Sequence, residues 1–79
     1  MATKVLIIDD EDDYRFIVEN ILTAEGYEVT TAASGSEGLE ALKTFSPDVI
    51  LLDWMMPRMD GETFCKTLRG DERFKKIPI

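Results

Sequence analysis

The chain has 79 residues, 44% of them hydrophobic, and a formal net charge of −7 at pH 7, which fits one small globular domain. The acidic balance argues against direct binding of nucleic acid, and no apolar stretch is long enough to span a membrane. The sequence contains no His, which excludes histidine catalysis and metal sites that use histidine ligands. The single Cys65 precludes an internal disulfide, and the first residues do not resemble a signal peptide, so we expect a cytoplasmic protein.

The first part of the chain predicts a strand, a helix and a second strand. The apolar run Val5–Ile8 is typical of a buried parallel strand. In the helix that follows we expect Asp12 or Asp13 to cap the start and Gly26 to mark the end. Residues 28–32 are rich in β-branched side chains and predict a short strand. The helix has one apolar face, which comprises Tyr14, Ile17, Val18, Ile21 and Leu22.

The rest of the chain continues the same alternation. Ser34, with Glu37 three residues later, forms a capping box that opens a second helix, and this helix must stop before Pro47. Strands that alternate with helices indicate an α/β fold with a parallel sheet. The later elements are expected at residues 49–52 (a strand covered on both faces), 54–59 (a loop), 60–70 (a helix capped by Asp60) and 76–79 (the start of a fourth strand).

Carboxylates follow two of the expected strands at the point where each strand ends. Asp9 and Asp10 come directly after the first strand, and Asp53 comes directly after the third. Open α/β sheets bind ligands at this edge, and carboxylates that converge there repel each other unless a hard cation such as Mg²⁺ joins them. A carboxylate can also attack phosphorus, so the pattern predicts a Mg²⁺ and phosphoryl site with Asp53 as the nucleophile. The alternative interpretation of Asp9–Asp13 is a solvated helix N-terminus, where acids are favoured anyway.

Three stretches of the sequence together resemble the receiver domain of bacterial two-component response regulators, such as the chemotaxis regulators. They are Val5–Asp10, Asp48–Gly61 with its run Asp-Trp-Met-Met-Pro-Arg-Met-Asp-Gly, and Lys76–Ile79. The resemblance implies a flavodoxin-like fold, here reduced to a βαβαβα unit with strand order 2-1-3. Residues 1–79 would then form the N-terminal two-thirds of a receiver, ending at the start of the fourth strand.

The resemblance also implies roles for individual residues. Asp53 would be the phosphoacceptor, which takes a phosphoryl group from a sensor histidine kinase or a phosphotransfer protein. Asp10 would bind Mg²⁺ directly and Asp9 mostly through water, and the backbone carbonyl of Met55 would complete the protein ligands beside Asp53. Receivers continue to a fourth strand that ends in Ser or Thr and a fifth that ends in a phosphoryl-binding Lys. We therefore expect a signalling domain rather than an enzyme, with phosphotransfer weakened in this chain.

Two other functions are compatible with the sequence. The first is a structural module that self-associates without phosphotransfer. Val49–Leu52 would keep a free apolar edge, and we expect a homodimer in which this strand or the Ile77–Ile79 tail crosses to the partner. The second is a metal-dependent phosphatase or hydrolase on a similar fold. Such enzymes use a second acid two residues after the nucleophile, where this chain has Met55.

Overall fold

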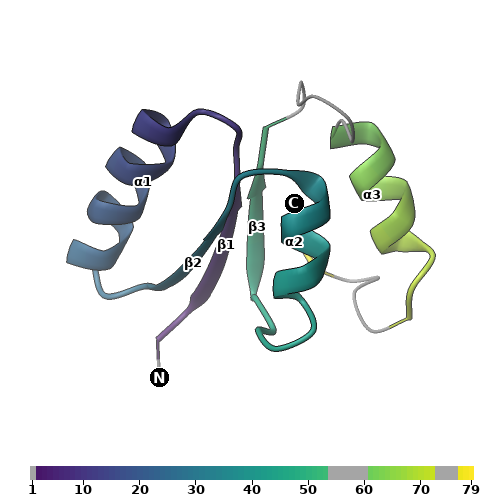
Figure 1. Cartoon of the computed structure of the whole chain (residues 1–79). Helices are drawn as coiled ribbons and strands as arrows, with labels where there is room; N and C mark the ends of the chain where they lie inside the picture. The colour runs from purple at the N-terminus through teal and green to yellow at the C-terminus, as the bar shows by residue number, and fades with distance from the viewer. Residues whose placement is uncertain (1, 54–60, 73–76) are drawn as a thin grey trace.

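Strands and helices alternate along the chain, as Figure 1 shows for the computed structural model, which describes residues 2–53, 61–72 and 77–79. The three strands form one parallel sheet with the order β2-β1-β3, so the predicted α/β fold and strand order are confirmed. No helix in the described part of the chain is both long enough and apolar enough to cross a membrane. The elements are β1 (Lys4–Ile8), α1 (Asp12–Ala24), β2 (Glu28–Ala32), α2 (Gly35–Ala41), β3 (Val49–Leu52) and α3 (Gly61–Arg69).

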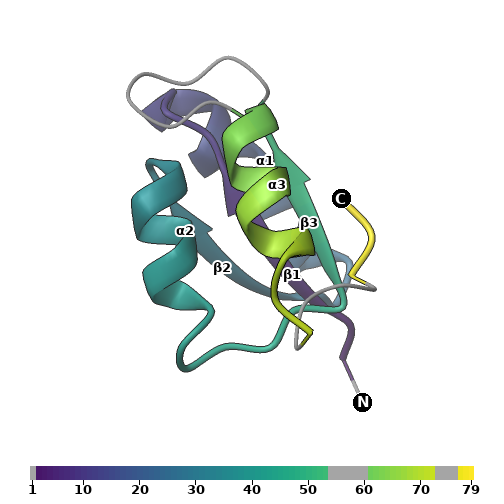
Figure 2. The same ribbon diagram turned by 90° about the vertical axis from the view of Figure 1, so that its right-hand side faces the viewer.

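The sheet separates two layers of helix. Helix α1 lies on one side, and α2 and α3 lie on the other side, in front of the sheet in Figure 2. Successive side chains of a strand point to opposite faces, so Leu6, Ile8 and Ile50 share the face that α2 and α3 cover. The buried core on this face comprises Leu6, Ile8, Ala32, Leu42, Ile50, Phe64 and Leu68. Contacts within this core hold the carboxyl ends of β1 and β3 against α2 and α3.

Helix α2 approaches the sheet very closely at Gly38. A Cβ atom built at this position would lie 2.5 Å from Cδ1 of Ile8 and 3.3 Å from Cε2 of Phe64. Both side chains are fully buried and have little room to move. Glycine therefore sets the distance between α2 and the last residue of β1.

The ends of α1 differ in part from the sequence prediction. The N-cap residue is Glu11 rather than Asp12 or Asp13, and its side chain makes no capping hydrogen bond. The cap thus lies one residue before Asp12 and two before Asp13, and the Asp9 carboxylate accepts the Glu11 N–H at 2.9 Å. Asp12 and Asp13 lie in the first helical turn, where the helix dipole favours acids.

The signals at the end of α1 and the start of α2 agree with the structure, whereas Asp60, the predicted cap of the third helix, lies outside the described residues. Gly26 ends α1 with a φ of 94°, in a Schellman motif that its neighbour completes: the Tyr27 N–H donates to the Leu22 carbonyl at 3.1 Å. At α2 the Ser34 Oγ accepts the Glu37 N–H at 3.1 Å. The reciprocal bond of the capping box reaches one residue further back, from the N–H of the residue before Ser34 to Glu37.

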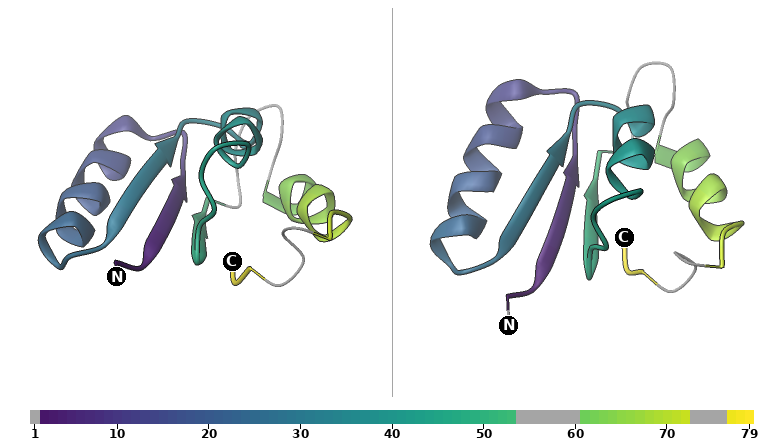
Figure 3. Two further views of the ribbon diagram at one scale, coloured as in Figure 1. Left: turned by 90° about the horizontal axis from the view of Figure 1, so that it is seen from below. Right: turned by 60° about the horizontal axis from the view of Figure 1, so that its bottom comes forward.

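The sheet face under α1 is only partly covered. Figure 3 shows from below that α1 lies over the β2 side of the sheet, and it packs on β2 and β1. Leu51 of β3 is consequently 41% exposed, so the prediction that this strand is covered on both faces is wrong. Three of the five residues of the predicted apolar face of α1 are also exposed, namely Tyr14, Ile17 and Ile21, whereas Val18 and Leu22 are half-buried.

The outer edge of β3 is not free, which corrects a second prediction. The Ile50 N–H donates to the Pro78 carbonyl at 2.9 Å, and Ile77 packs against the core. The tail Ile77–Ile79 thus lies along β3 of its own chain, although it is not a regular strand. The tail has this position because Ile77 gains burial at the place where a fourth strand was predicted. Lys76, the first residue of that prediction, lies outside the described residues.

Candidate metal centre

The register of the sheet brings the strand-end carboxylates to the same level. Ile8 pairs with Leu52 across β1 and β3, so the next residues along, Asp9 and Asp53, stand side by side. The Asp53 N–H donates to the Ile8 carbonyl at 2.9 Å, and the Asp9 N–H donates to the Ala32 carbonyl at 3.1 Å. Each aspartate therefore extends the sheet hydrogen bonding by one residue, and the sheet rather than a loop fixes its backbone.

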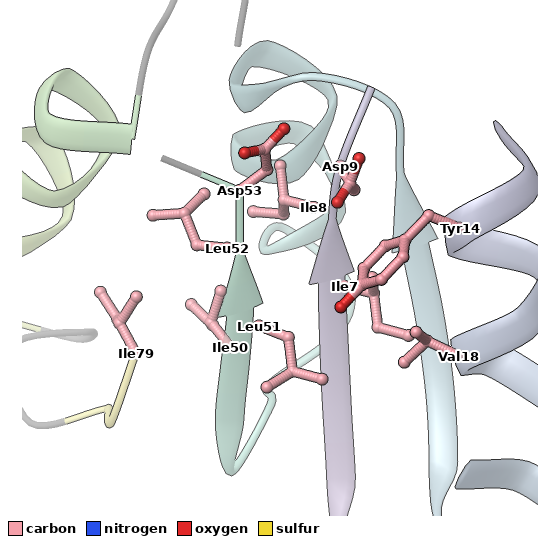
Figure 4. A pocket seen from close by; sticks show the side chains of 10 residues that line it. All are labelled: Ile7, Ile8, Asp9, Tyr14, Val18, Ile50, Leu51, Leu52, Asp53 and Ile79. Atoms are coloured by element: carbon pink, nitrogen blue, oxygen red, sulfur yellow. The ribbon is translucent and has the colours of Figure 1, made fainter. Parts of the chain in front are cut away.

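Three predicted site residues meet at this edge. One carboxylate oxygen from each of Asp9, Asp10 and Asp53 lies within 4.8 Å of the other two. Asp9 is buried with 8% exposure, Asp53 is half-buried, and Asp10 is exposed. Figure 4 shows Asp9 and Asp53 above the ends of β1 and β3. The exposed side of the cluster leaves an approach from solvent.

The donor set fits Mg²⁺. The ion prefers oxygen ligands at about 2.1 Å, which places opposite ligands about 4.2 Å apart and adjacent ones about 3 Å apart. The three carboxylate oxygens are already near that spacing, since none is more than 4.8 Å from another. Mg²⁺ also retains several water ligands, so an exposed member of the cluster suits it. Met55, the fourth predicted ligand, lies outside the described residues, as do Trp54 and Pro57 of the predicted loop.

A basic residue that the sequence prediction missed contacts the backbone of one residue of the cluster. Arg15, in the first turns of α1, donates from Nη1 to the Asp9 carbonyl at 2.7 Å and from Nη2 to the Asp12 carboxylate. Its side chain is 18% exposed. The sequence signal available for it was an arginine three residues after an acid at a helix start, a common pairing on exposed helix surfaces.

A groove runs from the carboxylates down the open face of the sheet. It has a volume of about 540 Å³ and includes Asp9 and Asp53 in its lining. Figure 4 shows Ile7 and Leu51 on the strands, with Tyr14 and Val18 of α1 to one side and Ile79 of the tail to the other. The acidic cluster is therefore the polar end of an otherwise apolar surface.

The sequence matches the family model described as the response regulator receiver domain over residues 5–79. This chain belongs to the response regulator receiver domain family. It is accordingly a receiver domain of two-component signalling, which confirms the resemblance predicted from the sequence.

Individual relatives agree with this assignment. The receiver is 43% identical over 79 residues to response regulator PleD of Caulobacter vibrioides; the alignment covers the whole chain and 17% of PleD. Its structure matches chemotaxis response regulator CheY4 of Vibrio cholerae with a TM-score of 0.95 and 40% identity, over the whole chain and 66% of CheY4. The receiver thus spans a small part of PleD and just under two-thirds of the CheY4 chain.

A further match concerns the metal. The receiver domain of sensor histidine kinase PA1611 from Pseudomonas aeruginosa has a magnesium ion coordinated in its active-site cleft. The receiver described here aligns with that structure at a TM-score of 0.91 and 26% identity, over the whole chain and 65% of the PA1611 domain. Receiver domains therefore occur both in response regulators and in histidine kinases among its relatives.

Proposed function

We propose that Asp53 is the phosphoacceptor of this receiver and that Asp9, Asp10, Asp53 and the Met55 carbonyl hold Mg²⁺ beside it. The observation that carries the proposal is the meeting of three carboxylate oxygens within 4.8 Å at the ends of adjacent strands. Bound Mg²⁺ would offset the negative charge of the cluster and provide a Lewis acid for a phosphoryl oxygen. The protein contributes the fixed positions of the carboxylates.

The reaction at Asp53 needs positioning more than acid–base catalysis. One carboxylate oxygen of Asp53 attacks the phosphorus of a phosphohistidine and forms an acyl phosphate bond. The phosphorus–nitrogen bond breaks, and the imidazole leaves with its electron pair and takes a proton from water. Phosphoryl transfer of this kind depends chiefly on alignment and charge stabilisation. The bond from the Asp53 N–H to Ile8 holds the backbone of the nucleophile during the attack.

We propose that the domain is cytoplasmic and that its phosphoryl donor is a sensor histidine kinase or a phosphotransfer protein, in line with the two-component proteins among the relatives. The domain acts in signalling, and we propose that it accepts a phosphoryl group rather than working as an enzyme. A net charge of −7 disfavours direct contact with nucleic acid. Residues 1–79 are proposed to correspond to the N-terminal part of a receiver domain, since they cover 66% of the CheY4 chain.

Self-association is a second proposal, supported by the open apolar surface. Tyr14, Ile17 and Ile21 of α1 are each more than half exposed, and Leu51 of β3 lies beside the same groove. An exposed apolar patch of this kind is unusual on a soluble monomer. A homodimer that packs these surfaces together with two-fold symmetry would bury both copies of the patch.

Phosphorylation of intact protein tests the main proposal. The chain is incubated with acetyl phosphate and Mg²⁺, and its mass is measured for the addition of one phosphoryl group. We expect modification of the wild type and of Asp13→Asn, an acid of the same segment outside the cluster, and none of Asp53→Asn. Equal modification of the wild type and of Asp53→Asn would show that the acceptor is another residue.

A further inference from the structure

Arg15 is unusual because it is a well-covered cation in the most acidic part of the chain. Five acids occupy positions 9 to 13, and Arg15 is the first basic residue after them. Its side chain is 18% exposed, whereas the partner carboxylate of Asp12 is 86% exposed. An exposed ion pair gives little reason to bury a guanidinium, so the bond to Asp12 alone does not account for this position.

The second bond of Arg15 reaches a residue of the metal centre. Nη1 donates to the main-chain carbonyl of Asp9 at 2.7 Å, six residues back in the sequence. A hydrogen bond with a charged donor is about twice as strong as a neutral one. The two nitrogens of the planar guanidinium donate in different directions. The bond from Nη2 to Asp12 orients the group, and the bond from Nη1 is accepted by the Asp9 carbonyl.

Asp9 is held at three atoms. Its N–H donates to Ala32, its carbonyl accepts from Arg15, and its Oδ1 accepts the N–H of Glu11 at 2.9 Å. Asp9 is only 8% exposed, so a carbonyl without a partner here would be costly, and the chain would move to expose it. Since the carbonyl and Oδ1 belong to the same residue, such a movement also turns the carboxylate.

We propose that Arg15 is a positioning residue for the metal centre: it fixes the Asp9 carbonyl and so aims the Asp9 carboxylate at Asp10 and Asp53. This inference rests on the proposed function for its consequence, which is the affinity for Mg²⁺. Groups that orient metal ligands in this indirect way typically contribute 10- to 100-fold in metal affinity. Because Arg15 acts through the backbone of one ligand, we expect the lower end, about tenfold.

The direction of the effect separates positioning from simple electrostatics. A positive charge behind a cation site repels the cation, so removal of that charge alone should strengthen binding of Mg²⁺. Loss of a positioning group should weaken it. A purely structural role in α1 would lower the melting temperature and leave the affinity unchanged.

The experiment compares Arg15→Met with Lys43→Met. Both substitutions remove one positive charge from an i,i+3 ion pair, but the exposed Lys43 lies in the turn after α2 and pairs with the exposed Glu40. Mg²⁺ is titrated against each 79-residue chain, with the emission of Trp54, the next residue after Asp53, as the signal. We expect about tenfold weaker binding for Arg15→Met and wild-type binding for Lys43→Met. Equal or tighter binding by Arg15→Met overturns the inference.

A second measurement does not depend on Mg²⁺. The Glu11 amide reports the Asp9 carboxylate, to which it is bonded, and the Gly38 amide, bonded to the Ser34 carbonyl in α2, is the control. In metal-free protein we expect Arg15→Met to accelerate hydrogen exchange at Glu11 and to leave Gly38 unchanged. If hydrogen exchange at Glu11 is the same in Arg15→Met and the wild type, the role of Arg15 is contradicted, whether or not the protein binds Mg²⁺. If the wild type binds no Mg²⁺, that separate result counts against the proposed function. Should Arg15→Met fail to fold, Arg15→Gln is measured against the same outcomes.

Discussion

Removal of one carboxylate from the cluster should stabilise the metal-free protein. Asp53→Asn keeps the shape of the side chain and removes its repulsion of Asp9, whose oxygen lies within 4.8 Å. At that separation two unit charges repel by about 0.9 kcal/mol with the dielectric constant of water and by about 3.5 kcal/mol with an effective value of 20. Asp53 is half-buried, so we expect a gain of about 1–2 kcal/mol in the free energy of unfolding.

Urea unfolding in EDTA at low salt measures this gain, with Asp13→Asn as the matched control. Asp13 lies in the first turn of α1, where its charge favours the helix, so its removal should slightly destabilise the protein. The gain for Asp53→Asn should shrink in about 1 M salt, where the screening length falls to about 3 Å.

Mg²⁺ should reverse the order of stability. Free Mg²⁺ at 100 times its dissociation constant adds about 2.7 kcal/mol to the wild type, and the variant with a damaged site should gain less. The reasoning fails if Asp53→Asn is no more stable than the wild type in EDTA at low salt. In that case the carboxylates do not repel each other appreciably, and the charge argument for a cation at this edge loses its basis.

Two further predictions concern packing. Gly38→Ala should lower the free energy of unfolding by about 1 kcal/mol, since the clash with Ile8 costs about 1–3 kcal/mol and the better helix propensity of alanine returns about 1 kcal/mol. Ile8→Val deletes Cδ1, the methyl group that clashes, so the double variant Gly38→Ala with Ile8→Val should recover part of the lost stability. Gly70→Ala is the control: a Cβ atom at Gly70 comes no closer than 3.6 Å to another atom, so this variant should be near neutral in the same urea titration. Ile21→Lys on the open face of α1 should shift a dimer to monomer in sedimentation velocity without loss of helix content. A wild type that is already monomeric at high micromolar concentration excludes the dimer.

The strand order and the acidic cluster could be predicted because both follow from patterns along the backbone. Apolar runs identified β1 and β3, and parallel pairing then required Asp9 and Asp53 to meet at one edge. The pairing of Ile8 with Leu52 is what places the backbones of Asp9 and Asp53 side by side, and this pairing follows from the register of the two strands. Glycine and capping signals at Gly26 and Ser34 worked for the same reason, since each acts over a few residues.

The errors arose where the outcome depends on packing between distant elements. An apolar strand such as β3 gives no sign of which helix will cover each face, and α1 covers β2 and β1 instead of Leu51. The edge of β3 was predicted to be free because complete fourth and fifth strands were not expected in this chain, whereas the Pro78 carbonyl accepts from the Ile50 N–H. Arg15 was missed because its partner is a main-chain carbonyl, which carries no sequence signature.

The fold and the proposed site are joined at the end of β1. Gly38 lets α2 press on Ile8, and Ile8 in turn presents its carbonyl to the N–H of Asp53. The next residue, Asp9, is held from the other side by Arg15. Packing of the core against the carboxyl ends of β1 and β3 thus holds the carboxylates together against their mutual repulsion. It follows that a substitution at Gly38, which touches no carboxylate, should weaken Mg²⁺ binding as well as stability, because it displaces the residue from which both strand-end aspartates are positioned.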